Sequence, residues 1–129
     1  MRVYLDTSVV LAQLLADIRF PPPSLWSESL VSSRLIQYEI WTTLHARGLT
    51  ASHTDVAREL LDALDLVELS PVVLTRALEP FPQPVRTLDA LHLATAEYLR
   101  VAGSPARLAT YDRRMRDVAS ELKLPLYDL

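Results

Sequence analysis

Four acidic residues that are far apart in the sequence occupy positions from which they could act together: Asp6, Glu39, Asp89 and Asp112. Asp6 and Asp112 each follow a short apolar run, as residues do at the carboxyl end of a parallel strand. Open α/β sheets place their binding crevice at that edge. Glu39 and Asp89 lie in apolar helical patterns, where a carboxylate normally costs free energy. Because converging carboxylates repel one another unless a cation lies among them, the pattern predicts a divalent-metal site.

Carboxylate oxygens select hard cations such as Mg²⁺ and Mn²⁺. Such a site could lower the pKa of a water and stabilise the charge that builds up on a phosphate under attack. Each acid also has a simpler explanation. Asp6 and Asp112 could cap helices, and Asp89 could complement the dipole of the helix that it enters. Glu39 could face water from an amphipathic helix.

Composition sets the limits within which such a site must be built. The chain has 129 residues, 50% hydrophobic and 22% charged, so we expect a single domain, residues 1–129, with a proper core. No apolar run approaches the roughly 20 residues of a membrane span, and no signal-peptide pattern opens the chain. The absence of cysteine excludes disulfides and thiolate metal sites, and we expect a cytoplasmic location.

The charge distribution gives weak signals. A net charge of −3 does not indicate a nucleic-acid binder, although metal ions would reverse the local sign of an acidic pocket. All basic residues except Lys123 are arginines. Arginine suits phosphate recognition, but we attribute the bias to composition.

Short apolar runs alternate with helical patterns along the chain. We expect strands at 2–5, 30–33, 66–69, 106–111 and 125–128, and helices at 7–16, 34–47, 51–65, from Pro71 onward, 86–102 and 113–122. The helix at 86–102 is apolar nearly all round, which is typical of a buried helix. This alternation predicts an α/β fold, with a mostly parallel sheet and helices on both of its faces.

Four segments resemble the motifs of a known family: Val3-Tyr4-Leu5-Asp6-Thr7-Ser8, Tyr38-Glu39-Ile40-Trp41, Leu88-Asp89-Ala90-Leu91-His92-Leu93-Ala94-Thr95-Ala96 and Ala109-Thr110-Tyr111-Asp112. Their order and spacing resemble the acidic motifs of the PIN-domain ribonucleases, and in particular the VapC toxins of bacterial toxin–antitoxin pairs. The similarity spans essentially the whole chain, and the third segment is much more specific than the first.

The resemblance implies a PIN-like α/β/α sandwich with a central, mostly parallel sheet. Its acids are expected to hold one or two Mg²⁺ or Mn²⁺ ions, and a metal-activated water to cleave RNA into 5′-phosphate and 3′-hydroxyl ends. The acidic quartet of the family is matched, in chain order, by Asp6, Glu39, Asp89 and Asp112. Ser8 matches a hydroxyl that often contacts the metal directly or through water, and Thr110 matches a polar position near the end of the last strand.

One departure from the family pattern follows the fourth acid. Many relatives carry another Asp or Asn there, where this chain has Arg113 and Arg114. Asp117 lies over one helical turn later and is a poor substitute, which weakens the expectation of a second metal site. Arg113 and Arg114, and Arg86 before the third motif, could contact RNA phosphates, or they could form a solvated helix face.

Other residues have weaker claims to a role. His92 could share a helix face with Asp89 and ligate the metal, but a packed histidine with a satisfied ring is the stronger interpretation. The resemblance implies a VapB-like antitoxin and a homodimer, with helices 34–47 and 51–65 as walls of the antitoxin groove. Candidates for that groove are Trp41 and Leu44. Candidates for a partner surface around the triple proline, unless they close the core, are Phe20, Leu25 and Trp26.

Two further functions stay open at this stage. A phosphoacceptor or phosphatase domain also places Asp at strand ends, but it generally needs a lysine near the site, and Lys123 lies too late in the chain. A PIN-like binding module would keep the fold and lose the catalysis. The sequence names neither the RNA nor the antitoxin.

Overall fold

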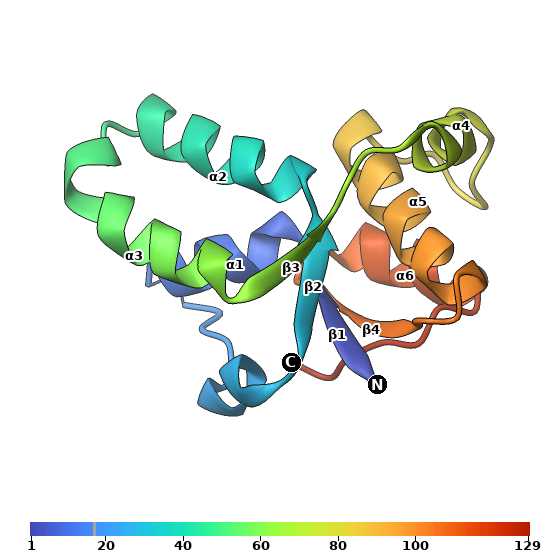
Figure 1. Ribbon diagram of the computed structural model, residues 1–129, viewed down its shortest axis with the longest axis horizontal. Helices are drawn as coiled ribbons and strands as arrows, with labels where there is room; N and C mark the ends of the chain where they lie inside the picture. Colours follow the sequence, from blue (N-terminus) through green and yellow to red (C-terminus); the bar gives the residue numbers. More distant parts are fainter. Residues whose placement is uncertain (17) are drawn as a thin grey trace.

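A parallel sheet of four strands forms the centre of the computed structural model, which describes residues 1–16 and 18–129 (Figure 1). The strands are β1 (Arg2–Leu5), β2 (Leu30–Ser33), β3 (Leu64–Val67) and β4 (Ala106–Ala109). Their order across the sheet is β3-β2-β1-β4, and every neighbouring pair is parallel. The carboxyl ends of β1 and β4 therefore lie side by side, with Asp6 and Asp112 just beyond them.

Helices cover both faces of the sheet (Figure 1). One side carries α1 (Thr7–Leu14), α2 (Leu35–Ala46) and α3 (Thr50–Asp62), with the short 3₁₀ helix η1 (Pro23–Ser27) below them in the view of Figure 1. The other side carries α4 (Pro71–Leu78), α5 (Thr87–Val101) and α6 (Arg113–Glu121). This arrangement confirms the predicted α/β/α sandwich. In the described part of the chain, no helix has the length and apolar character needed to cross a lipid bilayer.

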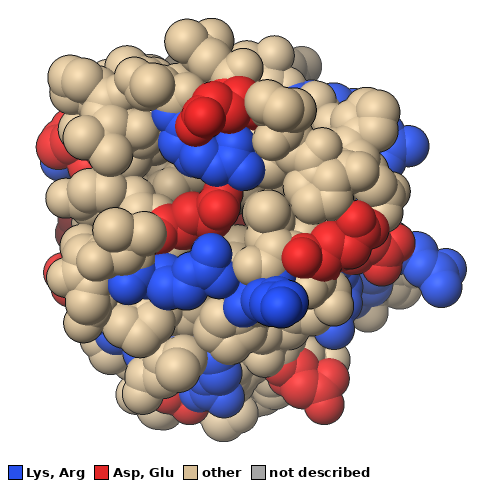
Figure 2. Space-filling model, turned by 90° about the vertical axis from the view of Figure 1, so that its right-hand side faces the viewer, with Lys and Arg blue, Asp and Glu red and all other residues tan. Residues whose placement is uncertain are grey.

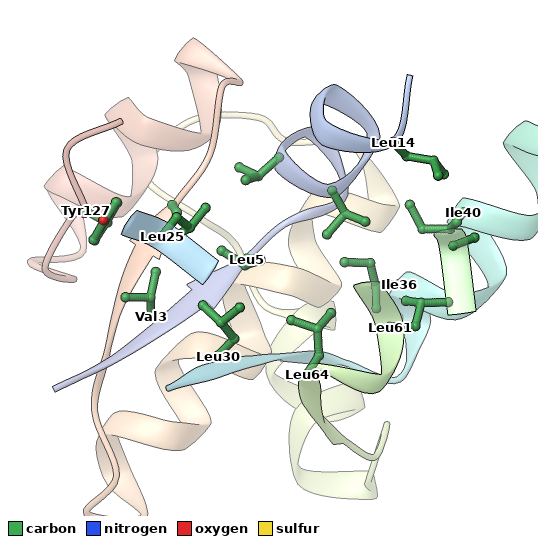
Figure 3. Packing of buried hydrophobic residues seen from close by; sticks show 14 of the residues in the cluster. Val3, Leu5, Leu14, Leu25, Leu30, Ile36, Ile40, Leu61, Leu64 and Tyr127 are labelled. Atoms are coloured by element: carbon green, nitrogen blue, oxygen red, sulfur yellow. The ribbon is translucent and has the colours of Figure 1, made fainter. Parts of the chain in front are cut away.

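The alternation of strand side chains creates one core on each face of the sheet. Val3 and Leu5 belong to the core under α1–α3, whereas Tyr4 between them packs with residues of α5 and α6. The first core gathers side chains from β2, β3, η1 and the three helices, among them Leu25, Leu30, Ile36, Leu61 and Leu64 (Figure 3). Both faces are thus buried, which is the usual condition of a parallel sheet.

A glycine lies just beyond the end of α2 and another just beyond the end of α5, close to the predicted helix ends at 47 and 102. Gly48 and Gly103 have φ angles of 66° and 82°, in the left-handed region that side chains with a Cβ rarely adopt. The amide that follows each glycine turns back and donates to a carbonyl of the last helical turn: Leu49 to Leu44 and Ser104 to Leu99, both at 2.9 Å. These bonds satisfy carbonyls that would otherwise be left free at the helix ends.

The boundaries between α3 and β3 and at the end of the chain differ from the prediction. Leu64 begins β3 instead of continuing the apolar face of a helix, so this strand occupies 64–67 rather than 66–69. No Gly or Pro separates the two elements, and an apolar pattern alone does not mark such a boundary. Residues 125–128 form a single bridge, between Leu108 and Leu126, instead of a strand. Pro125 has no N–H with which to extend the pairing.

Helix α3 offers a matched test of this packing. Leu61 is 6% exposed in the first core, whereas Val56 on the same helix is 48% exposed. We expect Leu61→Ala to lower the free energy of unfolding by about 2–5 kcal/mol, because it removes buried methyl groups and leaves a cavity. Val56→Ala is expected to cost less than about 1 kcal/mol. Urea denaturation of both variants measures the difference, and equal losses would contradict the assigned orientation of α3.

Candidate functional site

The four acids of the sequence motifs line one pocket of about 480 Å³ at the carboxyl ends of β1 and β4. Asp6 follows β1, Glu39 comes from α2, Asp89 from α5 and Asp112 from the residue before α6. Six further polar residues line the same pocket: Thr7, Ser8, Tyr38, Thr42, Thr43 and His92. The fold thus brings side chains from four separate segments to one cavity.

Asp6 is the most deeply placed of the four acids, at 4% exposure. It occupies the N-cap position of α1 but makes no capping hydrogen bond with its side chain. Its two carboxylate oxygens instead accept from hydroxyls: Oδ1 from Ser8 Oγ and Oδ2 from Thr110 Oγ1, both at 2.6 Å. The same hydroxyls accept from backbone amides after β4, Ser8 from Tyr111 and Thr110 from Asp112, both at 3.0 Å. Asp6 therefore ties the end of β1 to the loop that carries Asp112.

Burial raises the pKa of the Asp6 carboxyl above its ordinary value. The hydrogen bonds from Ser8 and Thr110 act in the opposite direction, because they favour the charged form, and the neighbouring His92 does the same. The net rise shows that these interactions do not fully replace the water that a carboxylate loses on burial.

The carboxylates of Asp89 and Asp112, which line the same pocket, repel each other. Asp89 lies in the first turn of α5 and is partly buried. Burial raises the pKa of its carboxyl, and the charge of Asp112 raises it further. Asp112 also caps α6, since its Oδ1 accepts from the amide of Met115 at 3.0 Å. The simpler explanation of Asp112 as a helix cap is thus correct, and the same side chain still lines the pocket.

Glu39 is held by a buried chain of hydrogen bonds that sequence patterns did not reveal. Its Oε1 accepts from Thr7 Oγ1 at 2.6 Å and lies 2.7 Å from His92 Nε2. The other ring nitrogen of His92 lies 2.7 Å from the hydroxyl of Tyr4. Burial raises the pKa of the Tyr4 hydroxyl, so the phenol keeps its proton. Because the Glu39 carboxylate can only accept, Nε2 of His92 carries the proton that it donates, and in the neutral ring Nδ1 accepts from Tyr4. His92, at 1% exposure, is the packed histidine with a satisfied ring that the sequence favoured.

The donor set of the pocket consists mainly of hard oxygens. Among the residues that the structure describes, no three Asp, Glu or His side chains form a cluster tight enough to enclose an ion as they stand. Mg²⁺ keeps several of its waters and commonly binds proteins through one or two carboxylates. A cation in the pocket would offset the repulsion between Asp89 and Asp112. It would also stabilise the charge of the buried Asp6 carboxylate. The residues present therefore fit a hydrated divalent cation.

The arginines singled out in the sequence lie outside this pocket. Arg113 and Arg114 are exposed on the first turn of α6 and do not line it. Arg86 precedes α5 and is also exposed, but it lies near enough to lower the pKa of Asp89 slightly against the larger effects that raise it. Any role of these side chains toward a phosphate remains a prediction.

The predictions that place Leu25 on a partner surface and Leu44 in the antitoxin groove are wrong. Leu25 and Leu44 are 0% exposed and belong to the first core, because η1 and α2 turn these side chains toward the sheet. Trp26 packs partly against the same core and donates from Nε1 to Gln13 Oε1 at 3.1 Å. Phe20 is 52% exposed, and Trp41 is partly buried and lines a surface cavity of α2 together with Tyr38 and His45.

The hydroxyl of Thr110 gives a direct test of how Asp6 is held. Thr110→Val keeps the shape of the side chain but leaves Asp6 Oδ2 without its donor and the amide of Asp112 without its acceptor. We expect a loss of about 1–3 kcal/mol in the free energy of unfolding, measured with urea. The matched control is Thr54→Val, since the Thr54 hydroxyl donates only to the helical carbonyl of Thr50 and its loss should cost less than about 0.5 kcal/mol. Equal effects would show that the Asp6 contact adds nothing.

Comparisons with known proteins agree with this geometry. A model of the PIN domain family matches residues 3–121. The chain is similar to Ribonuclease VapC46 of Mycobacterium tuberculosis (strain ATCC 25618 / H37Rv), with 39% identity over 126 residues, which cover 93% of this chain and 92% of that protein. It is also similar to Ribonuclease VapC47 of Mycobacterium tuberculosis (strain CDC 1551 / Oshkosh), with 30% identity over 120 residues, 88% of this chain and 86% of that protein.

A solved structure described as a toxin-antitoxin complex from Klebsiella pneumoniae has the same fold. One of its chains matches with a TM-score of 0.64 and 15% sequence identity, over 98% of this chain and 99% of that chain. The family match spans most of the sequence, and the similar proteins align over nearly all of it. The chain therefore belongs to the PIN-domain family, among its VapC-type members.

Proposed function

We propose that residues 1–129 act as a single PIN-like domain with metal-dependent endoribonuclease activity, the toxin of a toxin–antitoxin pair. The observation that carries this proposal is the convergence of Asp6, Glu39, Asp89 and Asp112 on one pocket. The similar proteins named as ribonucleases support RNA as the substrate. An RNA substrate in turn favours a cytoplasmic location.

Asp6, Asp89 and Asp112 would hold the ion, Mg²⁺ or Mn²⁺, with Ser8 contributing directly or through a water. When bound, a divalent cation supplies Lewis-acid polarisation of a phosphate oxygen and lowers the pKa of a water nearby. The donors near Asp112 give no clear place for a second ion, because exposed arginines stand at the next two positions. One ion is therefore the simpler proposal.

The residues of the chain supply position and charge. Ser8 and Thr110 fix both oxygens of Asp6, so this carboxylate does not reorient during the reaction. Thr7 and His92 fix Oε1 of Glu39 in the same manner. Glu39 faces the pocket, where it can accept a proton from a water or orient that water. No side-chain nucleophile is needed, which agrees with the absence of cysteine.

We further propose two protein partners on separate faces. The antitoxin would dock on the outer face of α2, where Tyr38 is 66% exposed and lies beside Trp41 in the cavity described above. A second copy of the chain would pair through α4 and α5, which expose Val72, Leu78 and Val101 at 64%, 88% and 84%. Figure 2 shows this side of the molecule, where wide uncharged areas separate charges of both signs.

Cleavage of a generic RNA by the purified protein tests the enzymatic proposal. We expect divalent-cation-dependent degradation that EDTA abolishes, and a loss of at least about a hundredfold in rate for Asp6→Asn and Asp89→Asn. Asp117→Asn is the control, because Asp117 is exposed on α6 and does not line the pocket. Full activity of either pocket variant, or in EDTA, would exclude this mechanism. Inactivity of the wild-type protein would favour a binding module.

The pKa shifts predict how stability depends on pH without added metal. The pKa of Asp89 is raised in the folded state, so its ionised form lowers the stability of the fold at neutral pH, and this penalty disappears as the pH falls below the ordinary carboxyl pKa. We expect Asp89→Asn to increase the free energy of unfolding at pH 7.5 by on the order of 0.5 kcal/mol, after allowance for solvent screening. The gain should shrink toward pH 3.5.

The control for this experiment is Asp128→Asn, because Asp128 is exposed and lies outside the helices and the pocket, so no comparable gain at pH 7.5 is expected. Addition of Mn²⁺ should then raise the unfolding midpoint of the wild-type protein more than that of Asp89→Asn, because only the former retains the complete site. A variant that loses stability at pH 7.5 without metal would contradict the assigned repulsion.

A further inference from the structure

A second pocket, of about 450 Å³, opens next to the acidic one and is lined by two arginines. Its walls are Ser8, Leu11, Ala12, Leu15, Arg19 and Arg47. Ser8 and Leu11 line both pockets, so the two lie next to each other at the first turns of α1. We call this cavity the arginine pocket.

Hydrogen bonds connect the arginine pocket to the centre of the acidic site. Arg19 donates from Nη1 to the carbonyl of Tyr111 at 3.3 Å, and its guanidinium lies 5.2 Å from the centre of the Tyr111 ring. The amide of the same tyrosine donates to Ser8, which donates to Asp6. Arg19 is therefore held beside the loop that carries Asp112. Tyr111 and Ser8 connect it to Asp6.

Among the described residues, Arg19 and Arg47 differ from five of the other arginines in having no carboxylate partner. Carboxylates pair with the guanidinium groups of five other arginines: Arg2, Arg34, Arg76, Arg100 and Arg107. Within residues 1–16 and 18–129, neither Arg19 nor Arg47 has a carboxylate at ion-pair distance. Both guanidinium groups can therefore bind an anion in this cavity without first breaking an ion pair. The neighbouring pocket is lined by four carboxylates.

The lining matches the chemistry of a nucleotide. Guanidinium groups bind phosphate oxygens as planar forks, and arginine loses less hydration than lysine on doing so. The side chains of Leu11, Ala12 and Leu15 form an apolar floor on α1, against which a sugar or a base can lie. A small anion alone would not use that floor, whereas a nucleotide within a strand uses both parts of the cavity.

We propose that the arginine pocket is a subsite for RNA, in which Arg19 and Arg47 bind a backbone phosphate next to the scissile one. This inference rests on the ribonuclease activity proposed above and assigns the direction in which the strand leaves the acidic pocket, along α1 toward the end of α2. Arg113, Arg114 and Arg86, by contrast, do not line either pocket.

Binding without cleavage tests the subsite. The fluorescence anisotropy of a labelled single-stranded RNA 8-mer is titrated with protein in EDTA, over a range of salt concentrations, for wild type, Arg19→Gln, Arg47→Gln and the double variant. Loss of either arginine should weaken binding about fivefold to tenfold at 50 mM salt. The double variant, which no longer neutralises this phosphate, should also reduce the slope of log K against log salt by about 0.7.

Arg58→Gln is the matched control, since Arg58 is exposed on α3 and has no ion-pair partner among the described residues. Circular dichroism checks that all variants are folded. If the double variant binds RNA as tightly as Arg58→Gln does, the proposed subsite is overturned. An acidic segment of a protein partner would then be the alternative ligand of this cavity. Absence of RNA binding by the wild-type protein would overturn it as well.

The cleavage assay separates this outcome from failure of the proposed function. If the subsite is wrong but the function is right, the wild-type protein degrades RNA, and the double variant degrades it with an unchanged KM. If the subsite is right, the double variant raises KM by the same factor as the dissociation constant, whereas kcat falls much less.

Discussion

The buried carboxylate of Asp6 is the contact on which the site depends. A charged group at this depth is tolerated only because two hydroxyls donate to it, and each hydroxyl also accepts from the chain after β4. The same contacts therefore stabilise the charge, join the ends of β1 and β4, and set the position of Asp112. Ser8 and Thr110 are small polar residues whose importance lies in this double role rather than in their own burial.

A second group of contacts holds Glu39, which lines the same pocket. Tyr4 belongs to the core between the sheet and α5, yet its hydroxyl reaches His92, and His92 reaches Glu39. Packing of the sheet and placement of a carboxylate are thus linked through one aromatic ring and one imidazole. The result is a cavity lined by four carboxylates, in which the raised pKa values of Asp6 and Asp89 reflect a cost to the stability of the fold. Such a cost is expected where function requires a cation.

The sequence was sufficient to predict the parallel sheet, the helices on both faces and the candidate acids, since strand-end acids and a buried helix with Asp89 are local patterns. It could not predict the hydrogen-bond chain from Tyr4 to Glu39, because Tyr4 reads as an ordinary strand residue and Thr7 as a helix cap. Leu25 and Leu44 were misjudged because an apolar side chain beside a loop or on an amphipathic helix can face either way. The arginine pocket depends on Arg19 and Arg47, which come from two unrelated segments without a motif.

The central claim is that the carboxylates of distant segments form a cation site. Anomalous diffraction from a crystal soaked in Mn²⁺ tests it most directly. We predict a peak in the pocket within ligand distance of oxygens from Asp6, Asp89 or Asp112, directly or through ordered waters. A crystal in which Mn²⁺ occupies other surfaces and leaves this pocket without a peak would contradict the account.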